Sequence, residues 1–215
     1  MSGPQTTAPL INAALRDLYP QAQGLAVAKT RPALDKHARA FIARSPFLCI
    51  GTADASGHAD VSPRGDPAGF VQVLDDHTIL IPDRPGNNRL DTMENIVANP
   101  NVGLLFFIPG LEETLRVNGK ARIIDDAAKL APAEVNRKAP KAGIEVRIEE
   151  VFLHCAKALK RSRLWDSSQH SDRREFPSIA RIILEQTSAP GAGPSEAAVA
   201  EGDAHVEDDY KNNMY

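Results

Sequence analysis

The spacing of hydrophobic residues predicts two amphipathic helices, over residues 33–44 and 89–98. Each stretch repeats its apolar residues every three or four positions, which places them on one face of a helix. These inward-facing residues are Leu34, Ala38, Phe41 and Ile42 in the first helix, and Leu90, Met93, Ile96 and Val97 in the second. Asn87 or Asn88 stands where a cap for the second helix is expected. Weaker patterns indicate further helices over residues 127–138 and 177–185.

Seven stretches of the chain have the alternating or β-branched and aromatic composition of strands. They cover residues 47–52, 58–64, 70–73, 78–81, 102–108, 113–124 and 143–154. Tight turns separate the first four, which favours an antiparallel meander or barrel over alternating βαβ units. We therefore predict a mainly β fold of the α+β class, with six or seven antiparallel strands in one barrel and helices covering it.

Three features of the longer strands make further predictions. Residues 102–108, VGLLFFI, are apolar at odd and even positions alike, which predicts a strand buried on both faces. Gly119 lies inside a long strand and indicates a β-bulge. In residues 143–154 the apolar positions change phase near Glu149 and Glu150. Because a one-residue shift moves every side chain to the other face, a bulge is expected there too.

The chain divides into a folded region and two flanking segments. Residues 31–187 contain the predicted helices and strands and form one domain, preceded by an N-terminal extension over residues 1–30. Residues 188–215 are rich in Gly, Pro and Ala, lack apolar periodicity, and carry six acidic side chains against one lysine. Such a segment buries too little apolar surface to offset the entropy of ordering, so we expect a disordered acidic tail. A partner-binding segment is the alternative.

Composition narrows the classes of function. The formal net charge of the 215 residues is −3, which argues against a broadly basic, nucleic-acid-binding surface. No apolar run approaches the roughly 20 residues that span a bilayer, so we expect no membrane partner. The N-terminal residues lack the pattern of a secretory signal, and two cysteines make no disulfide framework. We therefore expect a cytoplasmic protein, with no metal site.

The sequence lacks the phosphate-loop, GxGxxG, GxSxG and HExxH signatures. The remaining candidates for a binding site are three clusters of cationic and amide side chains. The clusters are VSPRGD with Arg64, PDRPGNNRLD with Arg84, Asn88 and Arg89, and TLRVN with Thr114 and Arg116 on one strand face. Guanidinium groups and free backbone N–H groups before a helix are suited to binding a phosphate. The three clusters together predict a pocket for a polar, anionic and partly aromatic ligand.

The ordered series SPRGD, DRPGNNRLD, NIVANPNVGLLF and ETLRVNG resembles the FMN-binding split-barrel family related to pyridoxamine 5′-phosphate oxidase. The resemblance covers about residues 45–124 and extends to LHCAKALKRSRLW at residues 153–165. It is strongest to the general oxidase-like bacterial branch. The Arg-x-His motif with which the biosynthetic oxidase holds its substrate has no equivalent here, so oxidation of pyridoxamine phosphate is not expected.

The resemblance implies FMN as the cofactor, bound in a split barrel at the interface of a homodimer. Backbone groups of Val61 and Ser62 would contact the flavin ring, and Arg64 would lie near the ring edge or the phosphate. The residues implied to hold the phosphate are Asn88, Arg89 and Arg84. Thr114 and Arg116 would face the flavin, and Trp165 would reach it from the partner subunit. Thr114 departs from the family, since the biosynthetic oxidase has glutamine there.

The function that follows is that of an FMN-dependent oxidoreductase acting on a small organic substrate. The flavin would carry the redox chemistry and the protein would bind and orient it. No side chain stands out as a catalytic acid or base. Two alternatives remain open: a non-catalytic module that binds flavin or haem for storage or sensing, and a related barrel that uses a deazaflavin.

Overall fold

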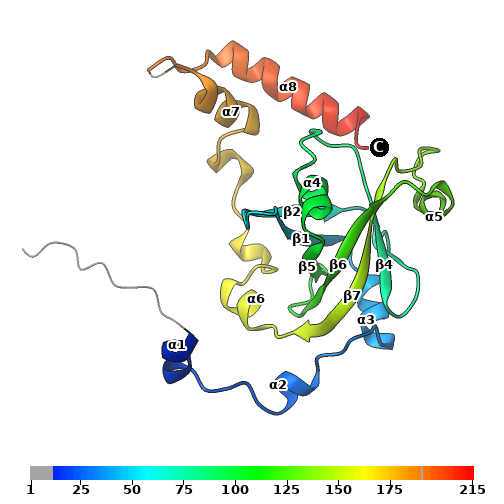
Figure 1. Cartoon of the computed structure of the whole chain (residues 1–215). Helices are drawn as coiled ribbons and strands as arrows, with labels where there is room; N and C mark the ends of the chain where they lie inside the picture. The colour runs from blue at the N-terminus through cyan, green and yellow to red at the C-terminus, as the bar shows by residue number, and fades with distance from the viewer. Residues whose placement is uncertain (1–11, 190) are drawn as a thin grey trace, which may run out of the picture.

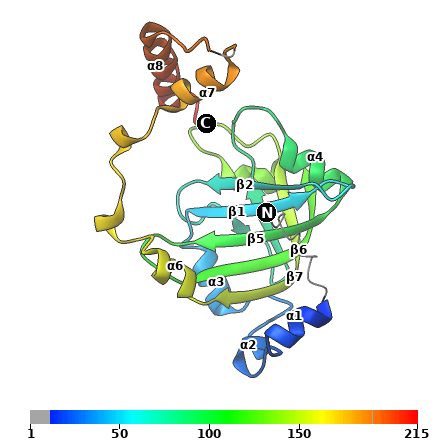
Figure 2. The same cartoon turned by 90° about the vertical axis from the view of Figure 1, so that its left-hand side faces the viewer.

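Seven antiparallel strands form one strongly curved sheet around which the rest of the chain is arranged (Figures 1 and 2). This computed structural model describes residues 12–189 and 191–215. In the order of their pairing, the strands are β2 (Ala59–Gly65), β1 (Phe47–Ala53), β5 (Asn101–Phe107), β6 (Thr114–Ile124), β7 (Gly143–His154), β4 (Thr78–Pro82) and β3 (Gln72–Val73). The predicted α+β class with an antiparallel split barrel is therefore confirmed.

Helices flank this sheet at its ends and edges (Figure 1). They are α1 (Asn12–Leu18), α2 (Leu25–Ala28), α3 (Lys36–Ile42), α4 (Asp91–Ala98), α5 (Ala127–Leu130), α6 (Lys157–Ser162), α7 (Ile179–Thr187) and α8 (Glu196–Asn212), with single 3₁₀ turns at Ala131–Ala133, Ser167–Gln169 and Arg173–Glu175. In the described residues, no helix combines the length and the apolar character needed to cross a membrane.

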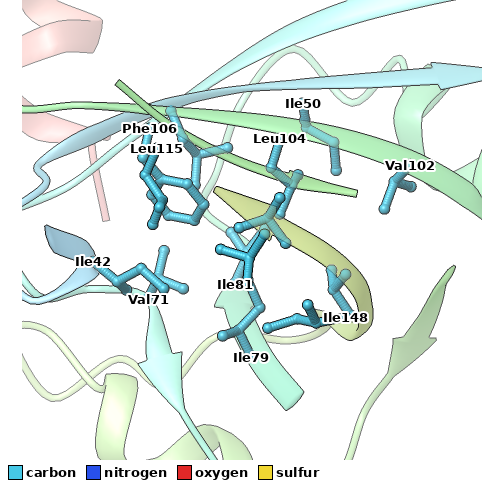
Figure 3. Close-up of a cluster of buried hydrophobic side chains, with 14 of the residues drawn as sticks. Ile42, Ile50, Val71, Ile79, Ile81, Val102, Leu104, Phe106, Leu115 and Ile148 are labelled. Carbon is cyan, nitrogen blue, oxygen red and sulfur yellow. The ribbon is translucent and has the colours of Figure 1, made fainter. Parts of the chain in front are cut away.

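The hydrophobic core fills the inside of the curved sheet (Figure 3). Alternate residues of the strands point inward because side chains on a strand alternate between its faces. The strand residues buried most deeply in this core are Leu48, Ile50, Ile79, Ile81, Leu104, Phe106, Leu115, Val117, Ile144 and Val146, each at most 1% exposed. Strand β5 follows the same alternation, and Leu105 and Phe107 on its outer face are only half-buried. The prediction of burial on both faces of β5 is wrong.

The two predicted bulges prove to be a single irregularity between β6 and β7. Asn118 pairs with Glu150 and Gly119 pairs with Ile148, so Glu149 is the extra residue in β7. The insertion moves Ile148 and Val151 onto the same buried face although three positions separate them. A Cβ at Gly119 would lie 2.1 Å from the carbonyl oxygen of Arg147, so this position accepts only glycine without a shift of the backbone.

Capping side chains explain where α3 begins and why α4 differs from the prediction. The Asp35 carboxylate accepts hydrogen bonds from the backbone N–H groups of His37 and Ala38. The bond from Ala38 is the main cause of the lowered pKa of this carboxyl. In α4 the cap position is Leu90, whose side chain makes no capping hydrogen bond. The prediction of an Asn87 or Asn88 cap is wrong, because the Asn87 side chain instead accepts a hydrogen bond from the N–H of Arg89.

The acidic C-terminal segment is folded where disorder was expected. Residues 196–212 form α8, which begins at a Ser195 cap whose hydroxyl accepts the N–H of Ala198. Its axis packs beside α7 above the barrel (Figure 2), and Gly202 lies so close that a Cβ there would be 2.9 Å from the Ala180 Cβ. An ion pair of 2.6 Å joins Arg181 to Glu196. Capping, many alanines and this close contact stabilise a helix that lacks a wide apolar stripe.

Candidate functional site

A hollow of about 1090 Å³ lies at the split between the two ends of the sheet. Strand β2 is at one end of the strand order, and the segment that leaves β4, residues 82–90, forms the opposing wall. The first turn of α4 and the loop over residues 138–141 complete the lining. The charged lining residues are Arg64, Arg84, Arg89, Lys138 and Lys141, together with Asp60, Asp83 and Asp91. Five cations against three carboxylates leave this hollow attractive to anions.

Two ion pairs cross the split and connect its walls. Arg64 on β2 donates from Nη1 to Asp83 Oδ1 at 3.0 Å, and Arg84 donates from Nε to Asp66 Oδ2 at 2.6 Å. The arrangement is reciprocal, because each wall contributes one arginine and one aspartate. The Asp66 side chain is 1% exposed and that of Arg84 is 18% exposed, so this second pair is largely withdrawn from water. Both arginines are thereby fixed in place at the hollow.

The loop between β4 and α4 adopts an unusual backbone conformation. Asn88 has φ of 57° and Leu90 has φ of 60°, in the left-handed region that is unfavourable for a leucine. Such strained positions gather at binding sites, where the surrounding structure holds them. Between them, Arg89 forms an exposed ion pair with Asp91, whose hydrogen bond raises the pKa of the guanidinium. An exposed pair of this kind contributes little to stability, so a ligand can replace Asp91 as the partner of Arg89 at little cost.

Arg64 also carries a polar atom that lacks a partner in the described structure. Its Nε is buried and makes no hydrogen bond to any described residue. A buried N–H without an acceptor is costly, and such groups mark places where a ligand or ion completes the structure. Arg64 lines the hollow, so a ligand bound there is in reach of this donor.

The structure brings six of the nine predicted site residues together around the hollow: Val61, Ser62, Arg64, Arg84, Asn88 and Arg89. The other three lie elsewhere in the same chain. Thr114 is 3% exposed at the start of β6. Arg116 lies on the outer face of the sheet, with its guanidinium over the Phe152 ring at 5.7 Å. Trp165 donates from Nε1 to the carbonyl of Leu111, beside the loop that precedes β6.

Sequence reasoning missed several residues that line the hollow, among them Lys138, Lys141 and Tyr215. Lys138 and Lys141 belong to a loop that precedes β7, and β7 pairs with β4, so the loop lies beside Asp83. The backbone N–H of Asp83 donates to the carbonyl of Ala142 at 3.0 Å, which fixes this neighbourhood. The KAPKAG sequence directly before a strand was the available signal for both lysines. Tyr215 reaches the hollow through α8, which lies in the segment predicted to be disordered.

Comparison with known families identifies the family to which the chain belongs. The family model for pyridoxamine 5′-phosphate oxidase matches residues 34–155, more than half of the chain. The chain belongs to the pyridoxamine 5′-phosphate oxidase family. The match includes both walls of the hollow and ends with β7 and Cys155. Comparison with curated proteins gives no significant match.

Several solved structures resemble this member of the pyridoxamine 5′-phosphate oxidase family. HupZ of Group A Streptococcus is 20% identical, with a TM-score of 0.46, over 56% of this chain and 93% of that chain. An FMN-binding protein of Syntrophomonas wolfei is 12% identical, with a TM-score of 0.43, over 55% and 84% of the two chains. The FAD binding protein of Mycobacterium smegmatis is 18% identical, with a TM-score of 0.39, over 58% and 97%.

The residues present fit the phosphate of a flavin nucleotide, the class of cofactor that the family resemblance implies. The orphaned Arg64 Nε and the exposed Arg89 guanidinium are donors suited to a phosphate. Gly86 leaves open space, since a Cβ built there would meet nothing within 4 Å. The volume of the hollow lies slightly above the roughly 300–1,000 Å³ of known ligand pockets, so the hollow has room for such a ligand.

Proposed function

We propose that this protein binds FMN in the hollow at the split and acts as an FMN-dependent oxidoreductase on a small organic substrate. The observation that carries this proposal is the convergence of Arg64, Arg84 and Arg89 on one cavity, with the Nε of Arg64 buried and without a partner. Arg64 and Arg84 each form an ion pair that joins the two walls, but Arg89 forms only an exposed pair that contributes little to stability. The packing of the two walls therefore does not account for all three guanidinium groups. A phosphate would satisfy all three.

Each wall of the hollow has a separate role in this proposal. Arg89, Arg84 and the backbone around Asn88 bind the phosphate. The exposed edge of β2, at Val61 and Ser62, lies along the flavin ring and offers its backbone groups. Arg64 lies between these regions, and its Nε donates to the phosphate and so stabilises negative charge on the cofactor. The bound flavin supplies hydride or electron transfer, and the protein binds and orients it.

Two of the remaining predicted contacts, Arg116 and Trp165, call for a second copy of the chain. Arg116 and Trp165 lie outside the hollow of their own chain, so a homodimer is the arrangement in which they reach a partner's flavin. The outer face of the sheet supports this, because Phe47, Leu105 and Phe107 leave apolar surface partly exposed there. Sedimentation of the purified protein tests the assembly, and a monomer at micromolar concentration contradicts it.

Cofactor identity is tested on the purified protein and on its apo form. We expect the visible absorbance of a flavin, release of FMN as identified by mass spectrometry, and reduction by a nicotinamide donor without air. The apo protein should bind FMN at least tenfold more tightly than riboflavin, since charge-assisted hydrogen bonds to the phosphate contribute about 1.5–3 kcal/mol. Equal affinity for FMN and riboflavin contradicts the phosphate site. A Soret band indicates haem, and a released deazaflavin indicates the related barrel class. Flavin that no donor reduces indicates a storage module.

Substitution of Arg64 tests the observation that carries the proposal. Arg64→Gln removes the charge and the orphaned donor, and should weaken FMN binding about tenfold with a smaller effect on riboflavin. Arg147→Gln is the matched control, because Arg147 is exposed on β7 and does not line the hollow. Fluorescence titration of both variants measures the affinities. An unchanged FMN affinity in Arg64→Gln removes Arg64 from the site.

A further inference from the structure

The C-terminal segment contributes a side chain to the wall of the hollow. Tyr215 follows α8 and lines the hollow beside Arg84 and Lys138. Its phenol donates a hydrogen bond of 2.7 Å to Asp66 Oδ1, and its ring lies 5.4 Å from the guanidinium carbon of Arg84. The Nζ of Lys138 donates to the backbone oxygen of Tyr215 at 2.5 Å. Three independent contacts therefore hold this one residue at the site.

These contacts act on Arg84, the arginine that the proposed function assigns to the phosphate. Asp66 accepts from Arg84 through one carboxylate oxygen and from Tyr215 through the other. The carbonyl of Ala133 accepts from Arg84 Nη2 at 2.9 Å. The guanidinium is thus held at Nε and Nη2 and lies beside an aromatic ring, a geometry that favours a cation. In the described structure, Nη1 is the guanidinium nitrogen without a protein partner.

The path of the chain explains how Tyr215 reaches this position. After α6 the chain runs along the outside of the barrel to α7, and α8 then returns toward β2 and α4 (Figure 2). The close packing of Gly202 on Ala180 and the Arg181–Glu196 ion pair fix α8 against α7. The end of α8 is thereby directed at the hollow. Asp66 and Tyr215 meet although 149 positions separate them in the sequence.

We propose that Tyr215 is a positioning residue that holds Arg84 so that its Nη1 is presented to the phosphate of the ligand. The proposal rests on the proposed function, since it names the group that organises the same phosphate site. The hollow of about 1090 Å³ exists with Tyr215 already in its wall, so the residue borders the cavity and does not fill it. A fixed guanidinium loses less conformational entropy on binding, which strengthens its hydrogen bonds to a phosphate.

The test compares variants of the full chain in the apo form, titrated with FMN and with riboflavin. Tyr215→Ala removes the ring and the phenol, and should weaken FMN binding about tenfold while riboflavin binding changes little. Tyr215→Phe keeps the ring over Arg84 and should show a smaller loss. Met214→Ala is the control, because Met214 is the neighbouring residue and its side chain is 61% exposed. Stopped-flow measurements should show that the affinity falls because the dissociation rate of FMN rises.

The outcomes separate this inference from the function on which it rests. If the unaltered protein binds no FMN, the proposed function fails and the role of Tyr215 fails with it. If the unaltered protein binds FMN and Tyr215→Ala binds it equally well, only the inference is overturned. Equal losses for FMN and riboflavin also overturn it, because they show a general effect on the cavity. Tighter and faster FMN binding by Tyr215→Ala overturns it as well, by showing that the segment obstructs the site.

Discussion

Asp66 holds two partners from distant parts of the chain with a side chain that is 1% exposed. One carboxylate oxygen accepts from Arg84 and the other from Tyr215, so both partners depend on its charge. The hydrogen bond with Asp66 raises the pKa of Tyr215 above its ordinary value, and burial of the phenol raises it further by a smaller amount. Asp66 therefore contributes to stability and to the arrangement of the site at once.

We predict that Asp66→Asn destabilises the protein by about 3 kcal/mol, because it leaves a largely buried guanidinium without its counter-charge. Asp91→Asn is the matched control, since it breaks an Arg–Asp pair at the same hollow whose members are 72% and 45% exposed. We expect the control to lose less than about 1 kcal/mol. Urea unfolding followed by circular dichroism measures both. Equal losses in the two variants contradict the role given to burial.

At the scale of single residues, the sequence predicts the cations of the site better than their partners. Arg64, Arg84 and Arg89 stand out because each lies in a short motif with proline, glycine or asparagine. The pairing of Arg64 with Asp83 depends on how the two ends of the sheet approach, which no local pattern contains. The position of Lys138 could not be predicted for the same reason, because only the pairing of β4 with β7 places its loop at the site.

Among the elements, the bulge between β6 and β7 has the sharpest steric requirement. A Cβ at Gly119 would lie 2.1 Å from a backbone oxygen of β7, and a backbone atom cannot rotate away as a side-chain end can. We predict that Gly119→Ala destabilises the protein by about 3 kcal/mol or prevents folding, in the upper range for overpacking. Gly193→Ala is the control, because a Cβ there would meet nothing within 4 Å. Thermal unfolding distinguishes the two, and an unchanged midpoint in Gly119→Ala contradicts the steric argument.

Elements are predictable where local sequence and packing agree. The strands and α3 follow their apolar patterns. Gly119 in β6 and the change of apolar phase at Glu149 in β7 lie on paired strands, and both indicate the same bulge. Helix α8 lacks such a pattern, since Val199 is its only residue among the buried hydrophobic side chains. Its start was nevertheless present in the sequence, as Ser195 followed by Glu196 and several alanines. Composition alone was a poor guide here, because capping and contact with α7 compensate for the small apolar surface.

For the molecule as a whole, Glu145 connects three elements through one buried charge. It lies on β7 and accepts from Arg122 Nε on β6 at 2.6 Å and from Lys129 Nζ on α5 at 2.5 Å. Burial acts to raise the pKa of Glu145, but hydrogen bonds from Lys129 and Arg122 outweigh it and lower the pKa below the ordinary 4.5. The carboxylate therefore stabilises the folded state while it remains ionised.

We predict that this contribution is complete above pH 4.5 and is lost as the pH falls through the lower folded-state pKa. The unaltered protein should accordingly lose more stability on acidification below pH 4.5 than Glu145→Gln, whose side chain does not titrate. Glu149→Gln serves as the control, because Glu149 is 55% exposed and lies 3.8 Å from Lys120. Urea unfolding across this pH range gives the comparison. Parallel pH profiles for the unaltered protein and Glu145→Gln contradict it.

The split in the sheet has a mechanical consequence for the whole protein. Strands β1, β5, β6, β7 and β4 have backbone ladders on both sides, whereas β2 is paired to β1 alone and its free edge forms a wall of the hollow. Widening the cavity therefore stretches side-chain contacts at the seam and leaves every ladder intact. We therefore expect the free edge of β2 to shift more easily than the strands that are paired on both sides, so the width of the hollow can change without disturbing the core.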